Sequence, residues 1–196
     1  MIKEKEKEII DQLIKDYNSN QEINDQIPVN IVEKIKEQNI ELNELCYDLH
    51  DDVLGEIKKE NGKYKINIQG YDFNYRRRFT MAHELGHYIL HKDLLDDEGL
   101  DDGLSYETMY RKNAKISSNQ ETQANKYAIE LLVPKQLIER IVFSLYKIPE
   151  IHKIFKENGE PNNHNLIEYL SDKFQVSKIA LTFRLKNISK NLYSNN

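Results

Sequence analysis

The chain has little cysteine, no tryptophan and no long apolar run among its 196 residues. Its one cysteine, Cys46, cannot form an internal disulfide and cannot supply a thiolate-rich zinc site, so we expect a reducing compartment. No segment approaches the ~20 apolar residues of a membrane-spanning helix, and the charged N-terminus lacks the apolar stretch of a signal peptide. We therefore expect a cytoplasmic protein with no membrane partner.

The chain also lacks a large excess of charge of either sign. The 28 Lys and Arg against 33 Asp and Glu leave a net charge of −5, which excludes a strongly basic chain that coats nucleic acid by charge alone. Hydrophobic residues make up 39% of the sequence, enough to close a core and to exclude wholesale disorder. The length fits one sizeable domain or two small ones.

The N-terminal half combines helical periodicity with strand signals. Asn61-Gly62 is the pair that a two-residue hairpin turn prefers, and it separates two strand-like runs at 53–59 and 63–69. Apolar spacing adds a helix over 3–17, a short helix from Pro28 to Asn39, a strand from Ile40 to Leu45 and a long helix over 75–91. The acidic stretch Asp93–Gly103 lacks the ligand spacing of an EF-hand loop, and we expect a solvated loop there.

The C-terminal half is predicted to be helical throughout. Ser118 is an N-cap candidate for a helix over 119–132, and Pro134 fits the start of the next helix. Two further short helices are expected to flank Ser177. The predicted fold class is therefore α+β: a mainly helical domain over 27–160 with a small sheet around the hairpin, an N-terminal helical extension over 1–26, and a helical segment over 161–196.

One sequence motif predicts a metal-binding site. His83-Glu84-Leu85-Gly86-His87 fits the H-E-x-x-H pattern on the predicted long helix. The four-residue spacing places His83 and His87 on one helix face, where both can bind one zinc ion, and it places Glu84 beside them as a general base. A catalytic zinc site needs a third protein ligand and an open position for water.

Several residues are candidates for that third ligand. His91 continues the four-residue series, but a straight helix would place it about 12 Å along the axis from His83. Asp93 follows His87 at the spacing used by metzincin-like proteases, although Leu90 replaces the glycine that turns their chain. Glu121 lies on the second predicted helix, as in gluzincin-like enzymes, and we favour it; Ser118-Asn119-Gln120-Glu121 also fits a capping box that needs no metal. Asn125, one turn further, could orient a ligand histidine.

Two stretches, 75–91 and 121–134, resemble the signature of the ImmA/IrrE family of metallopeptidase-like proteins. Tyr127 and Val133 are mild departures from the family's usual phenylalanine and methionine. The resemblance implies zinc held by His83, His87 and Glu121, with Glu84 as catalytic base. It also implies peptide hydrolysis directed at a helix-turn-helix repressor. The oxyanion-stabilising donor stays open among five residues: Tyr88, His91, Tyr106, Tyr110 and Tyr127.

Residues 166–188 form a second pattern, typical of a helix-turn-helix with Ser177 capping its second helix. Residues 165–191 contain five basic and two acidic side chains, a local charge of +3 in an acidic chain. DNA contact is therefore conceivable, and packing on the peptidase core or recognition of a protein partner is an equally good interpretation.

Three functional hypotheses follow. The first is a zinc endopeptidase of narrow specificity that cleaves a helix-turn-helix repressor and relieves repression of phage, mobile-element or stress genes. The second is a zinc-binding regulatory module that contacts DNA or a protein partner without hydrolysis. The third is the toxin component of a toxin–antitoxin pair. Glu84→Gln separates the first from the second, because it should abolish hydrolysis and leave metal binding intact.

Overall fold

The computed structural model describes residues 27–50, 53–71, 74–95, 104–105, 118–146 and 164–193. The predicted helix over 3–17 and most of the acidic stretch 93–103 lie outside these residues. The described residues belong to two compact units. The first contains those from 30 to 128, the second contains those from 129 onward together with 27–29, and a boundary falls within helix α4 (Ser118–Leu132). The fold class is α+β, as predicted.

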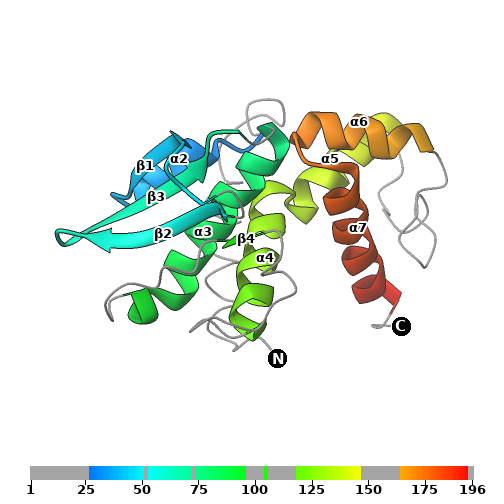
Figure 1. Cartoon of the computed structure of the whole chain (residues 1–196). Coiled ribbons are helices and arrows are strands. Elements are labelled where there is room, and N and C mark those ends of the chain that lie inside the picture. Colours follow the sequence, from blue (N-terminus) through cyan, green and yellow to red (C-terminus); the bar gives the residue numbers. More distant parts are fainter. Residues whose placement is uncertain are drawn as a thin grey trace. The chain divides into compact units, whose positions relative to one another are not determined.

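The first unit is built on a four-stranded sheet in the order β1-β3-β2-β4 (Figure 1). Strand β1 spans Glu41–Cys46, β2 Val53–Glu60, β3 Lys63–Gln69 and β4 Leu104–Ser105. Strand β3 pairs in parallel with β1 and antiparallel with β2, and β4 pairs antiparallel with β2. The predicted hairpin is confirmed: Glu60 pairs with Lys63, and Asn61 and Gly62 have φ angles of 50° and 78°, the positive values that a type I′ turn requires.

One face of the sheet is apolar and packs against helix α3 (Asn74–Leu95). Ile57, Ile66 and Ile68 are buried on this face, and Tyr64 stacks edge-on against Tyr88 of α3 with ring centroids 4.8 Å apart. A side chain at Gly55 would collide with Thr80 of α3, so the glycine permits the close approach of helix and strand.

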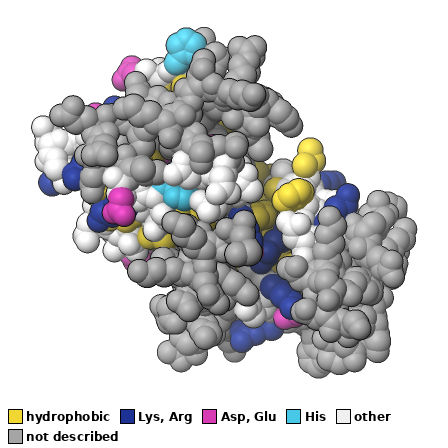
Figure 2. All heavy atoms as spheres, turned by 90° about the horizontal axis from the view of Figure 1, so that it is seen from below, with side chains coloured by type: hydrophobic (Ala, Val, Ile, Leu, Met, Phe, Trp, Pro, Cys, Tyr) yellow, Lys and Arg dark blue, Asp and Glu magenta, His cyan; other side chains and the backbone are white. Residues whose placement is uncertain are grey.

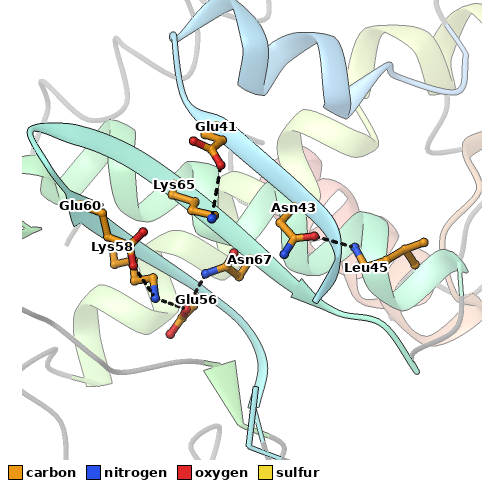
Figure 3. Close-up of polar contacts among 8 residues, drawn as sticks. All are labelled: Glu41, Asn43, Leu45, Glu56, Lys58, Glu60, Lys65 and Asn67. Atoms are coloured by element: carbon orange, nitrogen blue, oxygen red, sulfur yellow. Dashed lines mark hydrogen bonds and ion pairs between the residues drawn. The ribbon is translucent and has the colours of Figure 1, made fainter. Parts of the chain in front are cut away.

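The opposite face of the sheet is polar (Figure 3). Asn67 donates to Glu56 across the β2–β3 pair at 2.6 Å, and both side chains are buried. Lys58 lies between Glu56 and Glu60, at 3.2 and 2.8 Å from their carboxylate oxygens. The alternation along β2 therefore places hydrophobic packing on the α3 side and an ion-pair network on the other.

Helix α2 (Ile31–Glu37) precedes the sheet and confirms the short helix expected after Pro28. Its N-cap is Asn30, whose side chain accepts from the backbone N–H of Glu33. Helix α3 continues four residues past the expected end at His91. The backbone at His91 leaves the helical region (φ −133°, ψ 24°), so the regular helix that bears the histidine motif does end near the expected residue.

The second unit contains, in its described part, residues 27–29, the end of α4 and three further helices: α5 (Lys135–Tyr146), α6 (His164–Phe174) and α7 (Lys178–Tyr193). Three residues connect α6 to α7, and Gln175 among them has a φ of 51°. Ser177 caps α7 as predicted, because its hydroxyl accepts from the N–H of Ala180 at 3.1 Å. Within the described ranges, no helix has both the length and the apolar character needed to cross a membrane.

Candidate metal centre

Helices α3 and α4 bring three ligand-type side chains to one point in the first unit. The Nε2 atoms of His83 and His87 lie 2.8 Å apart, and the carboxylate of Glu121 lies 3.3 Å from the first and 3.1 Å from the second. Among the described residues these three form the group that could hold a metal ion, with all ligand atoms within 4.8 Å of one another. Four-coordinate zinc at about 2.0–2.1 Å from each ligand would set its ligand atoms about 3.4 Å apart, so the spacing fits such an ion.

The hydrogen bonds around the site support the same interpretation. The Oδ1 atom of Asn125, one turn after Glu121, lies 2.9 Å from Nδ1 of His83. An amide oxygen only accepts, so Nδ1 of His83 carries the proton and the lone pair of Nε2 faces His87 and Glu121. A lone pair and a carboxylate that face each other at this distance need a cation or a proton between them. The donor set of two imidazoles and one carboxylate suits zinc.

Burial distinguishes these residues from surface acids and histidines. His83 is 1% and His87 3% exposed, whereas the Glu121 side chain keeps 21% of its surface. Burial raises the pKa of Glu121, but hydrogen bonds and charge from His83 and His87 outweigh it and hold that pKa well below its usual range. The carboxylate is therefore ionised at neutral pH and available as a ligand.

Glu84 has the opposite electrostatic environment. It is 2% exposed, and its Oε1 atom has no hydrogen-bond partner. Burial is the main cause that raises the pKa of Glu84 to about 8; the charge of His87 acts to lower it, and the charges of Glu121 and Glu56 act to raise it. A carboxyl group with a pKa near neutrality can both take and return a proton, which is what a general base in hydrolysis must do.

A close contact between α3 and α4 sets the position of Glu121 relative to the histidines. A methyl group at Gly86 would lie 3.1 Å from the Tyr127 ring and 3.2 Å from the backbone oxygen of Ala124. Ala124 and Tyr127 are both buried, three and six residues after Glu121, on the face that meets α3. Gly86 is one of the two variable residues of the H-E-x-x-H motif, and its lack of a side chain allows α4 to approach α3.

The other candidates from the sequence lie elsewhere. Asp93 is exposed beyond the kink at His91 and is not part of the three-residue group. The Nε2 atom of His91 lies 3.4 Å from the backbone oxygen of Gln120, which places this histidine between the two helices. The Tyr88 ring stacks on Tyr64, its hydroxyl accepts from Lys92 at 3.3 Å, and Tyr127 is buried against Gly86. Tyr106 and Tyr110 lie outside the described residues.

Sequence reasoning missed Glu56, the buried carboxylate on β2 whose charge raises the pKa of Glu84. Its only signal is an acidic residue inside an otherwise apolar part of a predicted strand. That signal does not distinguish a buried glutamate from one on a solvated face.

Comparison with protein families gives a match that covers most of the chain. The Peptidase_M78 model, described as an IrrE N-terminal-like domain, matches residues 36–186. The matched range contains the three clustered side chains and extends through most of α7. No curated protein matches the sequence.

Among solved structures, a Mycobacterium tuberculosis transcriptional regulator resembles the chain with a TM-score of 0.49 and 12% sequence identity. The match covers 91% of this chain and 45% of that protein's chain, so this chain spans less than half the length of that regulator.

Proposed function

Because the chain belongs to the Peptidase_M78 family of IrrE N-terminal-like domains, we propose that it is a zinc-dependent endopeptidase of narrow specificity. His83, His87 and Glu121 are the proposed zinc ligands, and Glu84 is the proposed catalytic base. The observation that carries the proposal is the convergence of two imidazole Nε2 atoms and one carboxylate, at 2.8 to 3.3 Å from one another, beside a buried glutamate.

The residues of the chain have distinct roles in this proposal. Zinc, when bound, supplies the Lewis acidity that activates water and polarises a peptide carbonyl. Glu84 takes the proton of the attacking water on its carboxylate and returns it to the leaving amine. Asn125 holds His83 in the tautomer that keeps Nε2 free for the metal, a positioning role.

The proposed substrate is a helix-turn-helix transcriptional repressor in the cytoplasm, whose cleavage relieves repression of phage, mobile-element or stress genes. The resemblance of residues 75–91 and 121–134 to the ImmA/IrrE signature supports this choice of substrate. The α6–α7 pair supports the alternative, a zinc-binding regulatory module that acts on DNA or a protein without hydrolysis, because three residues join its two helices, a connection length typical of a helix-turn-helix.

Metal analysis tests the ligand set. We expect about one zinc per chain in the wild type and in Glu84→Gln, loss of zinc in Glu121→Ala, and retention in the matched variant Asp93→Ala. If Asp93→Ala lost the metal and Glu121→Ala kept it, the proposed ligand set would be wrong. If the wild type took up no zinc even after its addition, the proposed metal chemistry would be wrong as a whole.

Cleavage assays test the reaction. Purified protein is incubated with helix-turn-helix repressors from the same genome, and products are identified by mass spectrometry. We expect the zinc-loaded wild type to cleave one of them and Glu84→Gln to be slower by about 10² to 10⁴-fold, the usual contribution of a general base. If Glu84→Gln still relieved repression in cells, the regulatory module would be the better account.

A further inference from the structure

The second unit leaves two large apolar side chains uncovered on helix α7. Ile179 is 84% and Phe183 63% exposed, and they lie four positions apart in the sequence, so they are on the same helix face. We call these two residues the α7 patch. Figure 2 shows exposed hydrophobic side chains beside those of Lys and Arg on one face of the molecule. Large apolar side chains at neighbouring exposed positions mark interaction surfaces more often than single exposed residues do.

The charges around the α7 patch do not favour DNA as its partner. Between residues 166 and 188 the exposed charged side chains are two carboxylates and two ammonium groups, which balance: Glu168, Asp172, Lys173 and Lys178. Lys178 is already paired with Glu168 at 2.7 Å. A DNA-binding face needs a surplus of free positive charge to neutralise phosphates.

Arg184 explains why the local sequence charge of +3 overstates the basic character of this surface. Its guanidinium is 8% exposed, pairs with Glu130 at 3.1 Å and donates through Nε to the backbone oxygen of Val133 at 3.1 Å. This cation therefore joins α7 to the end of α4 inside the second unit and does not contribute to the exposed charge. Lys186 is half-buried.

We infer that the α7 patch binds the same patch of a second copy of this chain. An apolar centre whose surrounding charges balance lets two copies approach with no net repulsion, and an isologous interface places the same patch of both copies in contact. Antiparallel pairing of two α7 helices brings Ile179 of each copy against Phe183 of the other, because the two residues are about 6 Å apart along the axis.

Sedimentation velocity of the full chain tests this pairing. A patch of this size predicts a weak dimer, so concentrations from about 5 to about 500 μM bracket the expected transition. We expect the weight-average sedimentation coefficient to rise with concentration in the wild type. Ile179→Lys or Phe183→Asp should each raise the dissociation constant at least tenfold, since each places two charges in an apolar contact.

A mixing experiment makes the test specific. Antiparallel pairing predicts that Ile179→Lys and Phe183→Asp chains are each monomeric alone and associate when mixed, because the introduced ammonium faces the introduced carboxylate. Tyr71→Lys, at a 77% exposed aromatic side chain of the first unit, is the matched control and should dimerise like the wild type. Both patch variants should keep the circular dichroism spectrum of the wild type, because the replaced side chains are exposed.

Two sedimentation results would overturn the inference, and a DNA-binding result would do so as well. One is a wild type that stays monomeric across the whole concentration range. The other is a mixture of the two variants that stays monomeric while the wild type dimerises, since the α7 patch would then not be the contact. Binding of a labelled DNA duplex by the wild-type monomer, lost in both variants, would assign the α7 patch to DNA and would equally contradict the pairing.

Discussion

The two units bury ionisable side chains in different ways. In the second unit, buried Arg184 pairs with Glu130 and donates to the backbone of Val133. In the first unit, Oε1 of Glu84 and Nδ1 of His87 are buried and have no hydrogen-bond partner among the described residues. Natural proteins satisfy nearly all their buried polar atoms, so an unsatisfied group that persists is better explained by a ligand or a reaction than by stability.

This difference predicts opposite consequences for removing a buried charge. Deleting a charge that is fully paired leaves its partner uncompensated and destabilises the fold. Deleting one that is buried without a partner removes a desolvation cost and stabilises the metal-free fold, at the expense of the reaction. The following substitutions test this contrast from the largest expected effect to the smallest.

Arg184→Met should lower the free energy of unfolding by about 3 kcal/mol, because Glu130 and the carbonyl of Val133 lose their donor. Chemical denaturation at neutral pH measures the change. The double variant Arg184→Met with Glu130→Met should recover much of the loss, because no charge is then left unpaired. A loss of stability below about 0.5 kcal/mol, in the range of surface pairs, would show that this ion pair does not stabilise the second unit.

Glu84→Gln should raise the free energy of unfolding of the metal-free protein by about 2 kcal/mol at pH 8. Burial raises the pKa of Glu84 from 4.5 to about 8, so between these values the unfolded chain has lost the proton and the folded chain retains it. Stability of the wild type should therefore fall as pH rises through this window, by at most about 1.4 kcal/mol per pH unit for this group.

Glu84→Gln should lack this loss of stability with rising pH. Glu121 contributes with the opposite sign: its pKa is lowered in the folded state, so its contribution is present above pH 4.5 and is lost as pH falls below it. The matched control is Glu44→Gln at an exposed position of β1, which should leave the pH profile unchanged. If Glu84→Gln destabilised the metal-free protein at pH 8, this glutamate would be a paired structural group and not a poised base.

Asn125→Ala should weaken zinc binding by about 10- to 100-fold, because His83 loses the acceptor that fixes its tautomer. Competition with a chromophoric chelator gives the affinity. Asn125→Asp keeps an acceptor at the same place and should bind zinc at least as tightly as the wild type. Equal affinities for all three proteins would mean that Asn125 does not orient the ligand.

Much of this organisation could be predicted from local patterns. Helical periodicity over 75–91, the Asn61-Gly62 turn and the Ser177 cap all act within a few residues, so each could be recognised without the fold. The position of Glu121 could not, because Ser118-Asn119-Gln120-Glu121 fits a capping box as well as a metal ligand. Packing of α4 against α3 brings the Glu121 carboxylate beside His83 and His87, and that packing depends on residues far apart in the chain.

The remaining features depend on burial that composition does not reveal. Glu56 and Asn67 occupy the polar face of the sheet, where the sequence alternation predicts solvent, yet both are buried and bonded to each other. The sequence alone predicts that Arg184 is a basic surface residue. In the structure its side chain is buried and bonds α7 to Glu130 of α4 and to the backbone of Val133. In both cases tertiary contacts change the meaning of a charged side chain, and a single sequence carries no record of such contacts.

Gly86→Ala tests which of two effects has the larger influence on stability: the close contact between α3 and α4, or the helix propensity of the residue. Helix propensity alone predicts that alanine stabilises an interior helical position by about 1 kcal/mol relative to glycine. The structure predicts a net loss of about 1 kcal/mol, because the added methyl would meet the Ala124 backbone at 3.2 Å, and backbone yields less readily than a side chain. Since α4 must then move away from α3, the distance from Glu121 to the histidines should increase and zinc affinity should fall as well. A variant that is more stable and binds zinc as before would show that this contact does not position Glu121.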